Sequence, residues 1–207
     1  MKRRINTLAK AKDVAIDFEA VVTHNLNETI YELSNQANCD WLVVGWKGKA
    51  HNGILINNPI GWLMTHINSD FALFKDNGVR YISRVLLALR PGRKDKNFIA
   101  IADRICQFYN ASFTLLHVIP EDTKSEEVEQ MEAVSNKLLL KSTSISELKI
   151  LKSNNSIETI SKTSADYDLL ILGTPEKNNW MNVLFGTGKD KFADSSACSV
   201  LRLTMKE

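Results

Sequence analysis

Hydrophobic residues along this chain fall into two patterns. Short continuous apolar runs bounded by glycine or turn residues predict strands over 41–45, 71–75, 83–89, 112–119, 147–152, 168–173 and 199–203. Apolar residues at helical spacing predict helices over 28–37, 61–67, 95–109, 125–141, 156–165 and 187–193, and residues 2–12 are interpreted as the end of a helix. The segment 14–22 alternates apolar and polar residues, which predicts a half-buried strand.

The alternation of strands with helices predicts an α/β fold. Strands joined through helices form mostly parallel sheets with helices on both faces, and continuous apolar strands suit a sheet that is buried on both sides. Ligands of such folds bind beyond the carboxyl ends of the strands. The loops at 90–95, 118–122 and 173–186 are expected at that edge.

A partial internal repeat divides the chain. "CDWLVVGWKG" at 39–48 returns as "YDLLILGTPE" at 167–176, and each copy follows an "ETI" triplet. Repeated segments indicate repeated structural units. The "DNG" turn at 76–78 marks the predicted boundary, which gives a unit at 1–76 and a unit at 80–205. The first unit is shorter and is expected to lack its early strands.

Composition narrows the function classes. The 207 residues are 44% hydrophobic and carry 26 basic and 24 acidic side chains, well interspersed, so that the net charge is only +2. A dedicated nucleic-acid binder would carry a basic stripe, so this class is not expected. No apolar run approaches the roughly 20 residues that span a bilayer. The three cysteines and four histidines lack CxxC or HxxxH spacing, which predicts reduced thiols and no metal site.

The order of elements resembles the universal stress protein family. Residues 80–205 are similar to its complete five-strand pattern, and residues 1–76 resemble only the later part. The resemblance implies a parallel-sheet sandwich of the universal stress protein type, adenine nucleotide alpha hydrolase-like and Rossmann-like, with one and a half tandem units.

Nucleotide-binding members of that family carry a glycine motif after strand four. The resemblance places Gly173, Thr174, Gly186, Thr187 and Gly188 at this motif. Glycines let the backbone approach phosphates, and a hydroxyl with N–H groups at a helix N-terminus holds the anion.

Two other parts of the pattern differ. Glu176 stands where the family has a second glycine, and its carboxylate would repel a triphosphate. The family's Asp after strand one, beside adenine and ribose, corresponds to the stretch that follows Leu89, where Arg90 stands. ATP or AMP is therefore a possible ligand, and no cofactor is certain.

The first unit holds a degenerate version of the motif. Gly45 and Gly48 have the family's spacing, but twelve residues intervene before Gly61, and Trp62 replaces the hydroxyl residue. These glycines could equally serve only the tight turns of the fold.

No catalytic motif is found. The sequence holds neither a Walker pattern around Lys189 nor a GxSxG elbow. His117 could touch a ligand, but a structural histidine is expected. Trp46, Trp62 and Trp180 could cover a ligand or an interface, whereas Trp41 is expected in the core.

Three functions remain open. The degenerate motif, "VVGWKG" and the short linker look like the kind attached to transporters, which implies a non-catalytic cytoplasmic regulatory or dimerisation module on a membrane transporter. The alternative is a free-standing universal stress protein that binds ATP or AMP. An enzyme of the wider fold is the third. An incomplete unit would expose a sheet edge, so a homodimer is expected.

Overall fold

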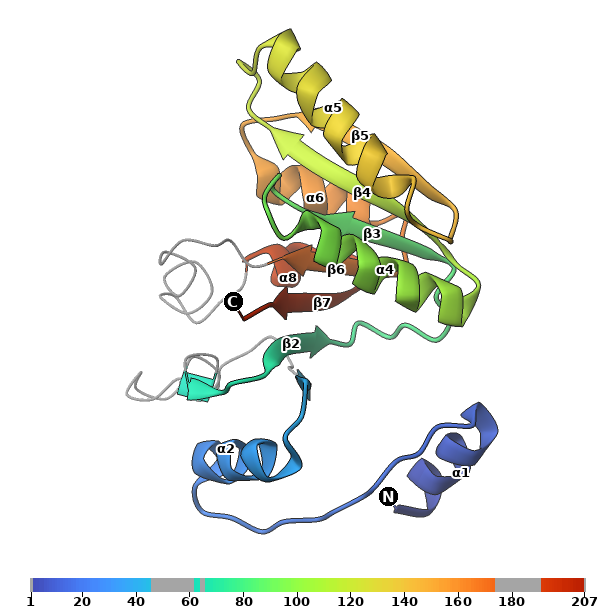
Figure 1. The fold of residues 1–207 in the computed structure, drawn as a ribbon, viewed down its shortest axis with the longest axis vertical. Coiled ribbons are helices and arrows are strands. Elements are labelled where there is room, and N and C mark those ends of the chain that lie inside the picture. The colour runs from blue at the N-terminus through green and yellow to red at the C-terminus, as the bar shows by residue number, and fades with distance from the viewer. Residues whose placement is uncertain (1, 46–61, 64–65, 174–190, 207) are drawn as a thin grey trace.

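A single mostly parallel sheet organises the molecule (Figure 1). The computed structural model describes residues 2–45, 62–63, 66–173 and 191–206. Its elements are α1 (Lys2–Lys12), α2 (Leu26–Ala37), β1 (Trp41–Gly45), β2 (Asp70–Lys75), β3 (Arg84–Ala88), α4 (Asp95–Tyr109), β4 (Ser112–Ile119), α5 (Ser125–Leu139), β5 (Ser146–Lys152), α6 (Ser156–Ser164), β6 (Leu169–Gly173), α8 (Lys191–Ser195) and β7 (Ser199–Thr204). The strand order in this part of the chain is β1-β2-β7-β6-β3-β4-β5.

The core lies on both faces of the central strands β3 and β6. Side chains of one face pack under α4, and those of the other pack against α6 and α8. Leu86, Leu87 and Ile171 are fully buried. This burial confirms the prediction that the continuous apolar runs form strands covered on both faces.

Matching side-chain caps begin α2 and α6. Asn25 accepts a hydrogen bond from the Glu28 N–H through Oδ1 (3.4 Å) and donates to Glu28 Oε2 (2.8 Å). Asn155 makes the same pair of bonds with Glu158, at 3.2 and 2.9 Å. The first bond of each pair satisfies a backbone N–H that the first turn of a helix leaves unpaired, and the second holds the two side chains together. The sequence likeness around "ETI" is thus also a likeness of local structure.

The strand predicted over residues 14–22 is wrong. These residues form no strand, and Val22 is 97% exposed. In Figure 1 the segment runs from α1 to α2 away from the sheet. A strand needs hydrogen bonds to a neighbouring strand, and an alternating pattern cannot supply that neighbour. β5, which precedes the matching helix α6, does pair with β4 and is a strand.

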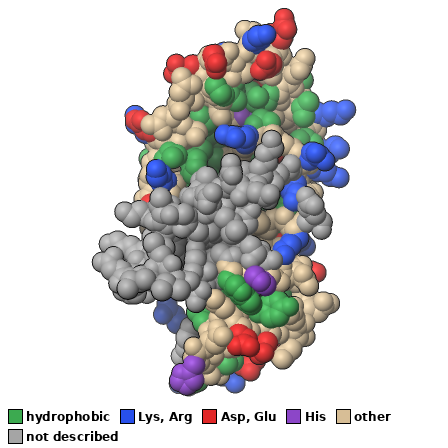
Figure 2. All heavy atoms as spheres, turned by 90° about the vertical axis from the view of Figure 1, so that its left-hand side faces the viewer, with side chains coloured by type: hydrophobic (Ala, Val, Ile, Leu, Met, Phe, Trp, Pro, Cys, Tyr) green, Lys and Arg blue, Asp and Glu red, His purple; other side chains and the backbone are tan. Residues whose placement is uncertain are grey.

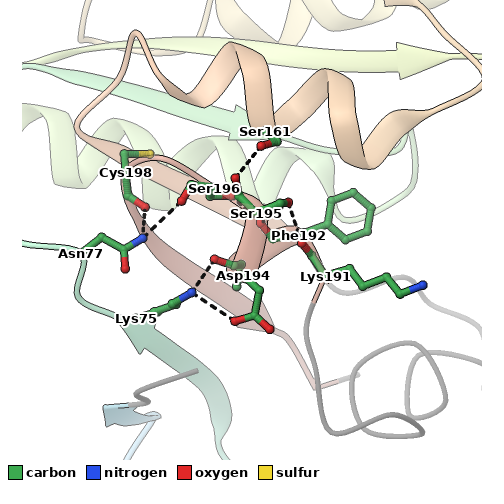
Figure 3. A network of polar contacts seen from close by, with 10 residues as sticks. Lys75, Asn77, Ser161, Lys191, Phe192, Asp194, Ser195, Ser196 and Cys198 are labelled. Atoms are coloured by element: carbon green, nitrogen blue, oxygen red, sulfur yellow. Dashed lines mark hydrogen bonds and ion pairs between the residues drawn. The ribbon is translucent and has the colours of Figure 1, made fainter. Parts of the chain in front are cut away.

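The two halves of the sequence meet where β2 pairs with β7. This pairing is antiparallel, with Leu73 opposite Arg202, whereas the other pairs in the sheet of the described residues are parallel. Beside it, Lys75 Nζ lies 3.1 Å from Asp194 Oδ1 and donates to the Ala193 carbonyl at 2.8 Å (Figure 3). Asn77 donates to the Cys198 carbonyl at 2.9 Å. Side chains from 75–77 thereby fix the loop around α8 against the sheet.

The cap of α6 gives a testable expectation. Asn155→Ala removes both bonds with Glu158, so we expect a loss of about 1 kcal/mol in the free energy of unfolding. Urea denaturation followed by circular dichroism measures it. Asn97→Ala, at an exposed position within α4, is the control and should cause no loss. Equal stability of Asn155→Ala and the wild type would contradict the role of this cap.

Candidate functional site

The candidate site lies at the carboxyl ends of β3 and β6. The two strands are neighbours, with Ala88 opposite Leu172, so Leu89, Arg90 and Gly173 come together at this edge as the sequence predicted. The other predicted positions of this motif, Thr174, Gly186, Thr187 and Gly188, lie outside the described residues, as does Glu176.

Gly173 is tightly packed. A Cβ atom at this position would lie 2.9 Å from Leu89 Cδ2 and 3.1 Å from two ring atoms of Phe98. Leu89 is 7% exposed and Phe98 5%. The side chains of β3 and α4 therefore fill the space in which a side chain at position 173 would stand, and the glycine has a packing role here.

The loop after β3 is held by a buried carboxylate. Asp95, the first residue of α4, accepts a hydrogen bond from the Gly92 N–H at 3.1 Å, and its own N–H donates to the Gly92 carbonyl at 3.3 Å. Sequence reasoning did not single out Asp95. An acidic residue at a helix start, three residues after a glycine, is the signal that could have found it.

The charge at this loop is positive. Arg90 and Arg93 are exposed, and Lys94 donates to the Met205 carbonyl at 2.9 Å. Figure 2 looks toward the side on which the strands end; Lys and Arg side chains border it, and acidic groups lie mainly toward the upper and lower ends. The described part of this loop therefore presents the exposed cations Arg90 and Arg93 at the carboxyl end of β3.

His117 has a structural role. Its side chain is fully buried, with Nδ1 3.0 Å from the Leu89 carbonyl and Nε2 3.0 Å from Ser135 Oγ. A carbonyl only accepts, so Nδ1 carries a proton, and in the neutral ring Nε2 accepts from the hydroxyl. The prediction of a structural histidine is confirmed. His117 joins β4, α5 and the end of β3, and it fixes the position of Leu89.

The glycines predicted in the first half do not form a described pocket. Gly45 ends β1, and a Cβ there would meet no atom within 4 Å. Gly48 and Gly61 lie outside the described residues, together with Trp46; Trp180 does so too. Trp62 stacks on His66 with ring centroids 4.2 Å apart and meets the edge of Tyr31 at 5.8 Å. Its contacts here are those of packing against α2.

The cysteines are free thiols of different exposure. Cys106 and Cys198 are buried, and burial raises the pKa of each thiol to about 11. Cys39 is half-buried, with Sγ 3.3 Å from Ser69 Oγ. In the described part of the chain, no group of three or more His, Cys, Asp or Glu side chains could hold a metal ion. No helix in this part is long and apolar enough to cross a membrane.

The fold is that of universal stress proteins. A universal stress protein from Archaeoglobus fulgidus DSM 4304 superposes with a TM-score of 0.66 at 14% identity, covering 100% of this chain and 77% of its own. The cytoplasmic domain of a prokaryotic cation chloride cotransporter superposes with a TM-score of 0.63 at 10% identity, covering 97% of this chain and 78% of its own.

A universal stress protein in complex with cAMP covers 61% of this chain and 100% of its own, with a TM-score of 0.50 and 13% identity. No protein-family model and no curated protein matches the sequence. The similarity of this chain to universal stress proteins therefore rests on the fold.

The role of His117 can be tested. His117→Ala leaves the Leu89 carbonyl and the Ser135 hydroxyl without their buried partner, so we expect a loss of about 1–3 kcal/mol in unfolding free energy. Thermal denaturation followed by circular dichroism measures the change. His24→Ala, at an exposed position, is the control. Equal stability of the two variants would show that His117 does not support this edge.

Proposed function

We propose that the chain comprises one and a half tandem units of the universal stress protein type, at 1–76 and 80–205. The matching caps at Asn25 and Asn155 support this organisation. The pairing of β1 with β2 and of β6 with β7, both parallel and in matching register, supports it as well. β2 and β7, the last strand of each unit, then join the two units.

We propose that these units form a non-catalytic cytoplasmic regulatory module attached to a membrane transporter. The observation that carries the proposal is the carboxyl end of β3 and β6, where Leu89 and Phe98 pack closely around Gly173 and the exposed Arg90 stands where the family pattern has an acidic group. His117 is committed to two structural bonds and is not free to transfer protons.

Attachment to a transporter is supported by one structural likeness. The cytoplasmic domain of the cation chloride cotransporter matches 97% of this chain, across both proposed units. The proposal extends the location of that domain, on the cytoplasmic side of a transporter, to this chain.

The alternative function is binding of ATP or AMP. A universal stress protein of similar fold is known in complex with cAMP, which favours a nucleotide site at the same edge. The site would use Gly173 and Thr174 after β6, with Gly186, Thr187 and Gly188 further along. Backbone N–H groups and the Thr187 hydroxyl would hold the phosphates. The degenerate motif of Gly45, Gly48 and Gly61 would have no ligand.

A calorimetric titration separates the two functions. We expect no binding of Mg-ATP or AMP at millimolar ligand, because Arg90 and Glu176 replace the groups that a nucleotide needs. The double variant Arg90→Asp, Glu176→Gly restores the family pattern and should gain measurable affinity. Micromolar binding to the wild type at one site per chain, weakened by Thr187→Val, would overturn the regulatory proposal and establish the alternative.

We also propose that the module acts as a homodimer. Residues 14–22 form an arm outside the sheet with an alternating pattern, and Val14, Ile16 and Val22 on its apolar face are 46%, 47% and 97% exposed. Antiparallel pairing of the arms of two copies would satisfy their backbone groups and cover their apolar face.

Sedimentation equilibrium tests this association. The wild type should sediment as a dimer at micromolar concentration, and Ile16→Asn with Val22→Asn should sediment as a monomer because the shared apolar face is lost. Val134→Asn, at an exposed position in α5, is the matched control and should remain dimeric. A monomeric wild type at all accessible concentrations would contradict the dimer.

A further inference from the structure

The two outer strands of the sheet differ in protection. β5, at one edge, carries Glu147, Lys149 and Lys152 and contacts α5. β1, at the other edge, is the uncharged run "WLVVG", and among the described residues it pairs only with β2. Charged side chains and covering helices are the usual means of keeping an edge from pairing. The open edge of β1 has no charged side chain of its own.

β6 is the strand that corresponds to β1 in the second half of the chain, and it has a neighbouring strand on each side. β1 and β6 both follow an aspartate and both pair in parallel with the next strand, with Trp41 opposite Asp70 and Leu169 opposite Ser199. On its other side β6 pairs with β3, and Ile171 is fully buried under α4. Val43, the corresponding residue of β1, is 60% exposed.

The aspartates that precede β6 and β1 differ in the hydrogen bonds that they accept. Asp168 Oδ2 accepts from the Ser83 N–H at 2.8 Å and from the Arg84 N–H at 2.9 Å, so its carboxylate holds the first amides of β3. Asp40 stands at the same place before β1 and is exposed. Within the described residues its carboxylate accepts no hydrogen bond. It is positioned to hold the first amides of a strand beside β1.

An apolar groove continues from this edge. It has a volume of about 430 Å³ and is lined by Trp41 and Val43 of β1, Ala72 of β2, Leu201 and Leu203 of β7, and one side of α4. Phe108 and Tyr109 of α4 are 57% and 45% exposed. Lys12 Nζ lies 5.6 Å from the centre of the Phe108 ring. The groove lies on the face that α4 covers over β6, and its mostly apolar lining suits the apolar side of an amphipathic helix.

We propose that the β1 edge and this groove together form a docking site for a polypeptide stretch outside these 207 residues. Its first part is a strand, apolar on both faces and parallel to β1, with its first amides bound to Asp40. Its second part is an amphipathic helix that lies in the groove. Residues 83–109, which contain β3 and α4, provide such an apolar strand and amphipathic helix at the corresponding place beside β6. The inference rests on the likeness of β1 to β6 and is independent of nucleotide binding.

Neither this chain nor a second copy offers such a strand in the described residues. β3, β4, β6 and β7 already pair on both sides, and β5 is charged. The arm at 14–22 would place Asp17 and Glu19 on one buried face. Two β1 strands paired through a two-fold axis perpendicular to the sheet would run antiparallel, so the first amides of one strand would not lie beside Asp40 of the other, as the proposed parallel strand requires.

Hydrogen exchange of the 41–45 amides tests the proposal. A copy of residues 80–131, fused ahead of residue 2, serves as a mimic of the missing strand and helix. The copy ends at residue 131 because the 130-residue spacing between Asn25 and Asn155 also relates residue 2 to residue 132. We expect exchange of these amides to slow by about tenfold or more in the fused chain. The matched control carries Leu86→Asp and Leu87→Asp in the added copy only, and it should give no protection.

Aspartate variants sharpen the test. Asp40→Asn should lower the melting temperature of the fused chain and leave that of the unfused chain unchanged, whereas Asp168→Asn should lower both. In a fused chain that is otherwise folded, unprotected amides among those of 41–45 that point away from β2 would overturn the proposal. Protection of the same outward amides in the unfused chain would also overturn it, because a second copy or the chain itself would then occupy the edge; the amides that face β2 are paired in both chains and do not enter the test. If the fused chain does not fold, a synthetic peptide of residues 83–109 added in excess to the unfused chain must give the same protection, and its failure overturns the proposal.

Discussion

Backbone pairing between neighbouring strands is the constraint on which the rest of this structure depends. β3 and β6 pair on both sides and are buried on both faces, so the centre of the sheet fixes α4, α6 and the loops that follow the strands. Residues 14–22 have a strand pattern but no neighbour, and they stay outside the sheet. The antiparallel pairing of β2 with β7 brings both halves of the sequence into one sheet.

The candidate site follows from the same pairing. Because β3 and β6 are neighbours, Leu89 and Gly173 meet at their carboxyl ends, and there the packing is close. Through its hydrogen bond with Ser135, His117 also connects this edge of the sheet to α5. Buried polar groups of this kind are costly unless every partner is present, which makes the edge rigid. A rigid, cationic edge suits a surface that other proteins contact, in keeping with the proposed regulatory role.

Among the described residues, the sequence predicted which three residues lie together at the candidate site, and it missed the contacts that support them. It placed Leu89, Arg90 and Gly173 at one edge, because the strands that precede them are clear apolar runs. It also assigned His117 a structural role. It did not find the brace between Asp95 and Gly92, or the contact of Leu89 with Gly173, because such contacts join residues whose closeness depends on the completed sheet.

By itself the sequence determined the α/β class, the position of nearly every described strand and helix, and the likeness of the segments around Asn25 and Asn155. These depend on local periodicity and on caps within one turn. Only the tertiary structure decided that, among the residues it describes, 14–22 pair with no strand, β1 pairs on one side only, and the Asp40 carboxylate accepts no hydrogen bond where that of Asp168 accepts two. The physical reason is that strand formation and carboxylate pairing depend on a neighbour distant in the sequence, which no local pattern reports.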